Sequence, residues 1–305
     1  MRISHVIATK GRPEVLREAL LSAVASLPQE GELIVVDGDP ERSAEAVVQE
    51  IDRPDGGPQI SYIAGVSGLC AQRNRGMDAA RGEVVIFTDD DCTLAPGFYE
   101  ALEEAYRDRD VIGVTGRVLQ APDERIGSNI ESPLRRIVLG GGRQGTMTSF
   151  GFRRPIIDVE NPRAIEYMPG TFMSARLAIA REVRFDEWLG RSSGYSLGED
   201  DDFSYRLSRR GTIRYVPSAA VHHHSIGKRT MDRRALDRLV VINRTYIFRK
   251  NFAGTLRARL GFAGLIALLF GHRIVNRDWQ GMRGLMDGLH DVWNEDRSRA
   301  GSAPA

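Results

Sequence analysis

The sequence predicts an α/β fold built on a parallel sheet, followed by a helical carboxyl-terminal extension. Two observations carry this prediction. Short apolar stretches alternate with longer helical patterns through the first third of the chain, as in β-α-β units. Beyond Thr230 the pattern is helical and basic throughout. A chain of 305 residues that is 42% hydrophobic can build one large domain or two modest ones.

The individual elements follow from apolar runs and from Pro and Gly at their ends. The expected strands cover residues 3–8, 33–36, 60–63 and 84–88. The expected helices are one that begins at Pro13 and three that cover residues 43–51, 71–80 and 199–210. Because ligands of such sheets bind at the carboxyl ends of the strands, we expect Thr9, Asp37 and Asp89 to share one site.

The second half of the chain is less regular. Residues 120–155 lose periodicity and are expected to form a long, mobile loop on the acceptor side of the site. Order returns at residues 165–169, and a strand at residues 213–216 leads to three consecutive histidines. Residues 298–305 are polar, and we expect them to be disordered.

Three carboxylates, Asp89, Asp90 and Asp91, follow the strand at residues 84–88. Carboxylates at the end of a buried strand are costly to desolvate unless a cation lies among them. Hard oxygen ligands suit Mg²⁺ or Mn²⁺, and Mg²⁺ commonly completes its shell with water and substrate phosphates. The alternative is a solvated acidic turn before the next helix, with Thr93 as the helix cap.

A second acidic cluster, residues 199–202, opens the last of the expected α/β helices. Acidic residues in a first turn also complement the helix dipole. Helical spacing places Asp200 with Phe203 and Leu207 on one face. Asp201 falls on a polar face instead, so Asp200 is expected to point inward. A carboxylate in such a position has a raised pKa and suits a general base.

The run His222-His223-His224 has two interpretations. It is either an exposed polar edge, or one of its imidazoles completes the shell of Mn²⁺ beside the carboxylates. In a strand, His222 and His224 face one way and His223 the other, so one side alone is expected to reach the metal.

Composition excludes several classes of protein. Lys plus Arg, 42 in all, balance 41 Asp plus Glu, which argues against a nonspecific nucleic-acid binder. Cys70 and Cys92 supply neither a disulfide framework nor a zinc knuckle, so a reducing compartment fits best. The amino terminus lacks the features of a signal peptide. We therefore expect a cytoplasmic protein, at the inner face of the membrane if it binds lipid.

The longest apolar stretch, residues 260–270, is too short to span a bilayer and is expected to be a core helix or an interfacial one. Its apolar stripe and the basic residues beside it are Leu256, Leu260, Ala263, Ala267 and Phe270, with Arg257, Arg259, His272 and Arg273. Such a segment either packs within a monomer or homodimer, or lies in a membrane interface and attracts anionic lipid. The sequence leaves both interpretations open.

Several short motifs occur in a defined order along the chain. They are Ala8-Thr9-Lys10-Gly11-Arg12, Val35-Val36-Asp37, Gly68 with Arg73-Asn74, Phe87-Thr88-Asp89-Asp90-Asp91, Gly198-Glu199-Asp200 through Arg206-Leu207, and Val216-Pro217 before the histidines. In this order they resemble glycosyltransferase family 2 over residues 3–228. The resemblance implies a GT-A fold, that is, a Rossmann-like nucleotide-binding sheet. It also implies a nucleotide-sugar donor and inversion of the anomeric carbon in one displacement.

The resemblance implies roles for the donor-side residues by their positions in these motifs. Thr9 and Asp37 line the nucleoside pocket, and Arg73 supports the base or the phosphates. Asp90 faces the ribose, and Asp89 lies close to the metal. The pattern departs from the family at Lys10-Gly11, where Tyr-Asn is common, and at Gly38, which separates a usually paired Asp. The donor base therefore stays open, with a UDP-sugar as the first candidate over GDP and dTDP sugars.

The resemblance also implies the chemical roles. Asp91 and His223 align with the metal ligands, and Asp200 with the catalytic base. The residues expected to line the sugar or the acceptor are Gly170, Thr171 and Glu199.

The implied protein is an inverting, Mn²⁺- or Mg²⁺-dependent glycosyltransferase that acts on a hydroxyl of a glycan or lipid-linked acceptor. Its catalytic domain is expected at residues 1–229, with a nucleotide-binding part (1–119) and an acceptor-side part (120–229), followed by a helical extension (230–305). The alternatives are a sugar nucleotidyltransferase and a noncatalytic saccharide-binding protein of the same fold. The first is disfavoured because a Gly-rich phosphate loop does not follow the first strand.

Overall fold

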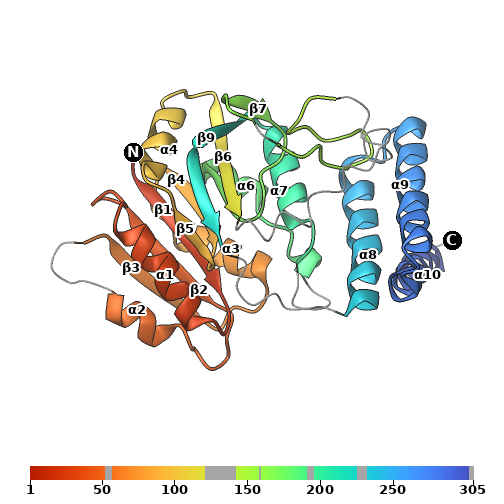
Figure 1. Cartoon of the computed structure of the whole chain (residues 1–305), viewed down its shortest axis with the longest axis horizontal. Coiled ribbons are helices and arrows are strands. Elements are labelled where there is room, and N and C mark those ends of the chain that lie inside the picture. The colour runs from red at the N-terminus through yellow and green to blue at the C-terminus, as the bar shows by residue number, and fades with distance from the viewer. Residues whose placement is uncertain (52–56, 121–141, 158, 191–195, 225–231, 302–305) are drawn as a thin grey trace. The chain divides into compact units, whose positions relative to one another are not determined.

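The structure is a computed structural model (Figure 1). It describes residues 1–51, 57–120, 142–157, 159–190, 196–224 and 232–301. Most of the expected loop, at residues 121–141, and the last four residues of the expected disordered tail lie outside the described residues. The chain divides into two compact units. Unit 1 comprises Met1–Arg135, Gly142–Thr146 and Arg154–Gly227, and unit 2 comprises Arg136–Gly141, Met147–Arg153 and Lys228–Ala305.

Unit 1 contains a nine-stranded sheet among its described residues. Its strands are β1 (Ile3–Thr9), β2 (Glu32–Asp37), β3 (Gln59–Ala64), β4 (Val84–Asp89), β5 (Cys92–Leu94), β6 (Val111–Gln120), β7 (Arg163–Ile165), β8 (Phe172–Arg176) and β9 (Thr212–His223). The sheet order is β3-β2-β1-β4-β8-β6-β9-β5, and β7 pairs with β9. Strands β1 to β4 are parallel, as expected, and Thr9 lies opposite Asp37 while Ala8 lies opposite Asp89. The carboxyl ends of these strands therefore meet at one edge.

Beyond these four strands the sheet is mixed, in the part of the chain for which the sequence predicted no pairing direction. Strand β8 is antiparallel to both of its neighbours, β4 and β6. Thr93 is not a helix cap, because it lies in β5, which pairs with β9. The next helix, α4 (Phe98–Tyr106), is preceded instead by Gly97 in the left-handed conformation.

Helices cover both faces of this sheet (Figure 1). Helices α1 (Pro13–Val24) and α2 (Glu45–Ile51) pack with α4 on the face that carries Ile3 and Ile7. Helix α1 buries Leu16, Leu20 and Ala23, spaced four and three residues apart, so the amphipathic pattern determines its buried side. The other face packs against α3 (Leu69–Ala79), α6 (Leu177–Val183) and α7 (Glu199–Ser208), with a short 3₁₀ helix, η2 (Glu187–Gly190), beside α3.

Unit 2 is helical, with α8 (Arg233–Asn251), α9 (Leu256–Val275) and α10 (Trp279–Gly301). Helix α10 continues four residues into the stretch that was expected to be disordered. Helices α8 and α10 run in the same direction, because Arg234 pairs with Asp287 and Arg238, one turn later, pairs with Asp291. Their backbones approach closely at Gly284, where an added Cβ would lie within 3.0 Å of the Arg234 backbone.

Candidate active site

Two of the three consecutive carboxylates at the end of β4 are buried, which contradicts the solvated-turn interpretation. Asp90 is 1% exposed and Asp91 is 7% exposed. Asp90 accepts a hydrogen bond from Thr9 Oγ1 at 2.7 Å and is ion-paired with Arg12. Arg12 Nη1 also lies 3.3 Å from Asp91 Oδ2. The chain itself therefore supplies one cation among these carboxylates. Arg12 belongs to this site, although the sequence reasoning gave it no role.

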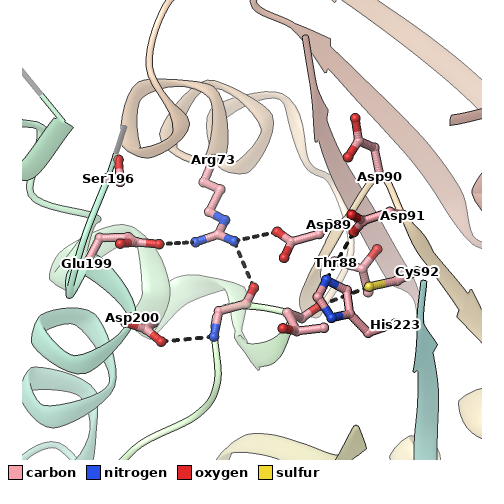
Figure 2. Close-up of polar contacts among 12 residues, drawn as sticks. Arg73, Thr88, Asp89, Asp90, Asp91, Cys92, Ser196, Glu199, Asp200 and His223 are labelled. Atoms are coloured by element: carbon pink, nitrogen blue, oxygen red, sulfur yellow. Dashed lines mark hydrogen bonds and ion pairs between the residues drawn. The ribbon is translucent and has the colours of Figure 1, made fainter. Parts of the chain in front are cut away.

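Asp91 and His223 face each other where β5 pairs with β9 (Figure 2). His223 Nε2 lies 3.3 Å from Asp91 Oδ1. His222 and His224 are exposed, as the strand alternation predicts, and His224 Nε2 contacts Thr93 Oγ1 at 2.8 Å. Of the three histidines, His223 is therefore the one that the fold directs at the carboxylates.

This pair has the donor set that a divalent cation requires. Asp91 Oδ1 is buried, and the 3.3 Å contact with His223 Nε2 is not aligned as a hydrogen bond. One ligand atom each from Asp91, Cys92 and His223 lie within 4.8 Å of one another. Burial raises the pKa of the Cys92 thiol, which donates to Thr171 O at 3.8 Å, so the thiol stays protonated and is a poor ligand for a hard cation. Carboxylate oxygen and imidazole nitrogen remain, and they suit Mn²⁺.

Charge also favours a cation here. Burial alone would raise the pKa of Asp91, but contact with His223 and the nearby Arg12 holds it below its usual range. Asp91 therefore stays ionised at neutral pH, as a metal ligand must.

Arg73, from the first half of α3, connects three segments at this edge of the sheet (Figure 2). Its guanidinium pairs with Glu199 Oε1 at 3.2 Å and with Asp89 Oδ1 at 3.1 Å. It also donates to Gly170 O at 2.8 Å and lies over the ring of Phe185. Because Arg73 is only 1% exposed and has protein partners on both terminal nitrogens, its observed contacts are structural.

Glu199 and Asp200 begin α7, after Gly198, whose φ of 83° favours glycine. Glu199 is buried, and burial together with the neighbouring Asp200 carboxylate raises its pKa. Asp200 Oδ2 accepts a hydrogen bond from Gly170 N at 3.1 Å. The backbone of Gly170 therefore links Arg73, through its carbonyl oxygen, to Asp200, through its N–H.

The orientation expected for the acidic cluster is wrong in one respect. Asp201 and Asp202 are fully buried, whereas Asp200 is only partly buried. Helix α7 packs against other elements on more than one side, and Arg206 neutralises Asp202 at 2.7 Å. Buried charges are tolerated when they are paired in this way. Asp200, by contrast, is left partly exposed.

Asp37, at the end of β2, is fully buried. Its Oδ1 accepts from Asp39 N at 2.8 Å, and its Oδ2 accepts from Ala44 N at 3.2 Å and from Tyr62 Oη at 2.9 Å. These contacts fix the loop after β2, so the direct protein contacts of Asp37 shape the expected base pocket. Asp39, two residues on, is more exposed.

The fold places the protein in the GT-A class of glycosyltransferase folds. The sequence matches the family described as Glycosyl transferase family 2 over residues 4–176, and the chain belongs to that family. Succinoglycan biosynthesis protein ExoM of Rhizobium meliloti (strain 1021) is 28% identical over 231 residues, which cover 73% of this chain and 66% of that protein.

Two solved structures have the same fold. GalNAc-T7 with UDP, GalNAc and Mn²⁺ has a TM-score of 0.56 at 18% identity, covering 79% of this chain and 48% of that one. The mannosyltransferase PcManGT from Pyrobaculum calidifontis, in complex with GDP-Man and Mn²⁺, has a TM-score of 0.56 at 15% identity. It covers 96% of this chain and 87% of its own.

Proposed function

We propose that the protein is an inverting, metal-dependent glycosyltransferase. It moves a sugar from a nucleoside-diphosphate sugar to a hydroxyl of a glycan or lipid-linked acceptor. The observation that carries this proposal is the arrangement at the carboxyl edge of the sheet. A buried carboxylate, Asp91, with the partly buried imidazole of His223 beside it, and the partly exposed Asp200 belong to one unit and one edge. Two structures of this fold contain a nucleotide and Mn²⁺.

Asp91 and His223 are the residues that would hold the cation. When bound, Mn²⁺ or Mg²⁺ supplies positive charge that offsets the negative charge of the departing nucleoside diphosphate. On the donor side, Thr9 and Asp90 are already hydrogen-bonded to each other, so together they present a preformed wall to the ribose. Asp37 contributes to the base pocket indirectly, because it fixes the loop after β2 that shapes this pocket.

Asp200 is the proposed general base. It takes the proton of the acceptor hydroxyl while that oxygen forms a bond to the anomeric carbon. The bond from the anomeric carbon to the diphosphate oxygen breaks on the opposite face, and the diphosphate leaves with the electron pair. Because the acceptor oxygen attacks the face opposite the departing diphosphate, the configuration of the anomeric carbon is inverted. The hydrogen bond from Gly170 N holds the Asp200 carboxylate in position and leaves it able to accept a proton.

The sugar and acceptor are proposed to lie against Gly170, Thr171 and Glu199. Asp89 and Arg73 support this floor from below, because Arg73 joins Asp89 and Glu199 to the Gly170 carbonyl. In this proposal Arg73 orients the site through the protein, and any contact with the phosphates is secondary.

A nucleotide panel tests the proposal most directly. UDP, GDP and dTDP are each added with Mn²⁺ and with a chelator, and the melting temperature is measured. One nucleotide should raise the melting temperature when Mn²⁺ is present and not when the chelator is. The reason is that a ligand of the native state stabilises by RT ln(1 + [L]/Kd). The matching sugar nucleotide should then be hydrolysed slowly without acceptor. No shift with any nucleotide would contradict a donor site, and a shift without hydrolysis would favour a noncatalytic binding protein.

A further inference from the structure

Helix α9 presents an apolar face to solvent. Its 20 residues are long and apolar enough to cross a membrane by length and composition, but only 11% of its most apolar window is buried. The helix is thus longer than the apolar stretch noted in the sequence, and it is not a core helix. We define the α9 stripe as Leu256, Leu260, Ala263, Ala267, Ile274 and Val275, all of which are exposed.

Several side chains of the α9 stripe are highly exposed. Leu256 is 72% exposed, Leu260 is 65% exposed and Val275 is 82% exposed. Contiguous apolar patches of this kind mark interaction sites. Phe270, which the sequence reasoning placed in the stripe, is partly buried instead.

The charged residues of α9 itself are all basic. No Asp or Glu occurs between Asp237 and Asp278, whereas Arg257, Arg259 and Arg277 are exposed at the two ends of α9. An apolar helical face flanked by exposed arginines complements an anionic lipid surface.

Helix α10 also exposes large apolar side chains. Trp279, Met286 and Trp293 are spaced by seven residues, which places them on one side of the helix, and they are 55%, 48% and 63% exposed. Tryptophan is favoured at membrane–water interfaces because its ring is apolar and its indole nitrogen donates a hydrogen bond.

Contacts within unit 2 determine how α9 can meet a bilayer. Arg273 Nε and Nη2 pair with Asp237 on α8 at 2.7 and 3.0 Å, and Asp237 is 2% exposed. Phe262 stacks on Phe248 of α8 with ring centroids 4.3 Å apart. A membrane-spanning α9 would have to break both contacts and leave Asp237 without Arg273. Helix α9 keeps both if it lies flat at the surface.

We propose that the α9 stripe docks on the headgroup region of an anionic lipid bilayer, with α9 parallel to the membrane plane. This proposal does not depend on the transfer reaction. It therefore fails or holds separately from the proposed function.

Vesicle flotation tests the proposal with the full chain. Phosphatidylcholine vesicles with phosphatidylglycerol should carry the protein upward at low salt, and pure phosphatidylcholine vesicles should carry much less. High salt or alkaline washing should release it. Failure to float with anionic vesicles would overturn the proposal, and so would retention after alkaline washing, which would indicate a spanning helix.

Variants assign the binding to the stripe. Leu260→Glu combined with Ala267→Glu should lower the bound fraction by about tenfold or more. The matched control is Leu21→Glu on α1, another exposed leucine, at 44% exposure, which should bind normally. Arg257→Gln, a milder change, should weaken binding about fivefold. Equal binding by the double variant and the control overturns the proposal.

Light scattering of the same samples tests a second copy as the occupant. A lipid-docking stripe predicts the same particle mass for the wild-type protein and the Leu260→Glu, Ala267→Glu variant. If the wild-type protein is a dimer and this variant is a monomer, the proposal is overturned, because the stripe would then be covered by a second copy of the chain.

Discussion

Arg73 and Glu199 form a buried ion pair across 126 residues of sequence, with 3.2 Å between Nη1 and Oε1. The pair joins the first half of α3 to the first turn of α7. It is 2% and 8% exposed at the two side chains, so neither charge has water as a substitute partner.

Replacing Arg73 with Met should therefore be costly, because it leaves Glu199 and Asp89 without their cation. Breaking a buried pair costs about 3–5 kcal/mol. The matched control is Arg17→Met, which breaks the exposed pair with Glu50 and should cost far less, because an exposed ion pair contributes little to stability. Urea denaturation measures both free energies of unfolding. Glu199→Gln in the Arg73→Met background should restore part of the lost stability. Equal losses of stability in Arg73→Met and Arg17→Met would contradict this assignment.

Asp91→Asn should weaken Mn²⁺ binding, because it removes the charge that the metal site offers. We expect a loss of at least about 10–100-fold, the range that changes to outer-shell partners already produce. Titration with Mn²⁺ alone, followed by its paramagnetic signal, measures this without any donor. Asp108→Asn, at a largely exposed carboxylate, serves as the control. Unchanged Mn²⁺ affinity in Asp91→Asn would move the metal elsewhere.

Asp200→Asn should separate catalysis from binding. The amide keeps the shape and can still meet Gly170, but it cannot take a proton, so kcat should fall by roughly 10²–10⁴. The donor Kd should stay near the wild-type value, which calorimetry with the matching nucleotide and Mn²⁺ measures. A normal kcat with weakened donor binding would make Asp200 a binding residue.

His5 should make stability depend on pH. Its Nδ1 lies 2.8 Å from Tyr99 Oη and its Nε2 lies 2.8 Å from Thr88 Oγ1, and burial lowers the pKa of His5 to about 3. The unfolded chain binds a proton near pH 6.5 and the folded one does not. Stability is therefore complete above pH ~6.5 and falls on acidification toward pH ~3, by about 1.4 kcal/mol between pH ~7.5 and ~5.5.

Other groups titrate in the same range, so the measurement must be a difference. Burial raises the pKa of Asp90 to about 6, and a raised carboxyl pKa stabilises the fold on acidification, opposite to His5. Subtracting the pH dependence of His5→Gln from that of the wild-type protein isolates the His5 contribution. Identical pH profiles would show that His5 does not remain neutral.

Gly284 and Gly264, both in helices of unit 2, should respond oppositely to alanine. Gly284→Ala brings Cβ into the Arg234 backbone on α8 and should destabilise by about 1–3 kcal/mol. Gly264→Ala meets nothing within 4 Å and should stabilise by about 0.5–1 kcal/mol through helix propensity. Thermal denaturation compares the two. A neutral Gly284→Ala would mean that α8 and α10 are not in close contact.

The parallel half of the sheet could be predicted from sequence because β2 and β4 contain continuous apolar runs and helical patterns separate β1, β2, β3 and β4 along the chain. The mixed half could not. Strand β8 lies between β4 and β6 through pairings between residues far apart in the chain, such as Val84 with Arg176, and local patterns carry no information on such pairings.

The candidate site divides in the same way. Strand alternation was sufficient to direct His223 away from His222. Arg12 could not be assigned, because its partner Asp90 lies 78 residues away and a lone arginine after a strand carries no chemical signature. The burial of Asp202 was also hidden, since a helical wheel treats an acidic residue as outward-facing unless its partner, here Arg206, is known.

Three consecutive residues of α3 each hold a different segment of the site. Gln72 donates to the carbonyls of Thr9 and Val36, both at 2.8 Å, and Asn74 donates to Phe185 O at 2.9 Å. Arg73, between them, holds Gly170. If any one of these segments were replaced by that of a relative with another donor or acceptor preference, its contacts with α3 would be lost. Changes of specificity should therefore require replacement of α3 together with the segments that it contacts.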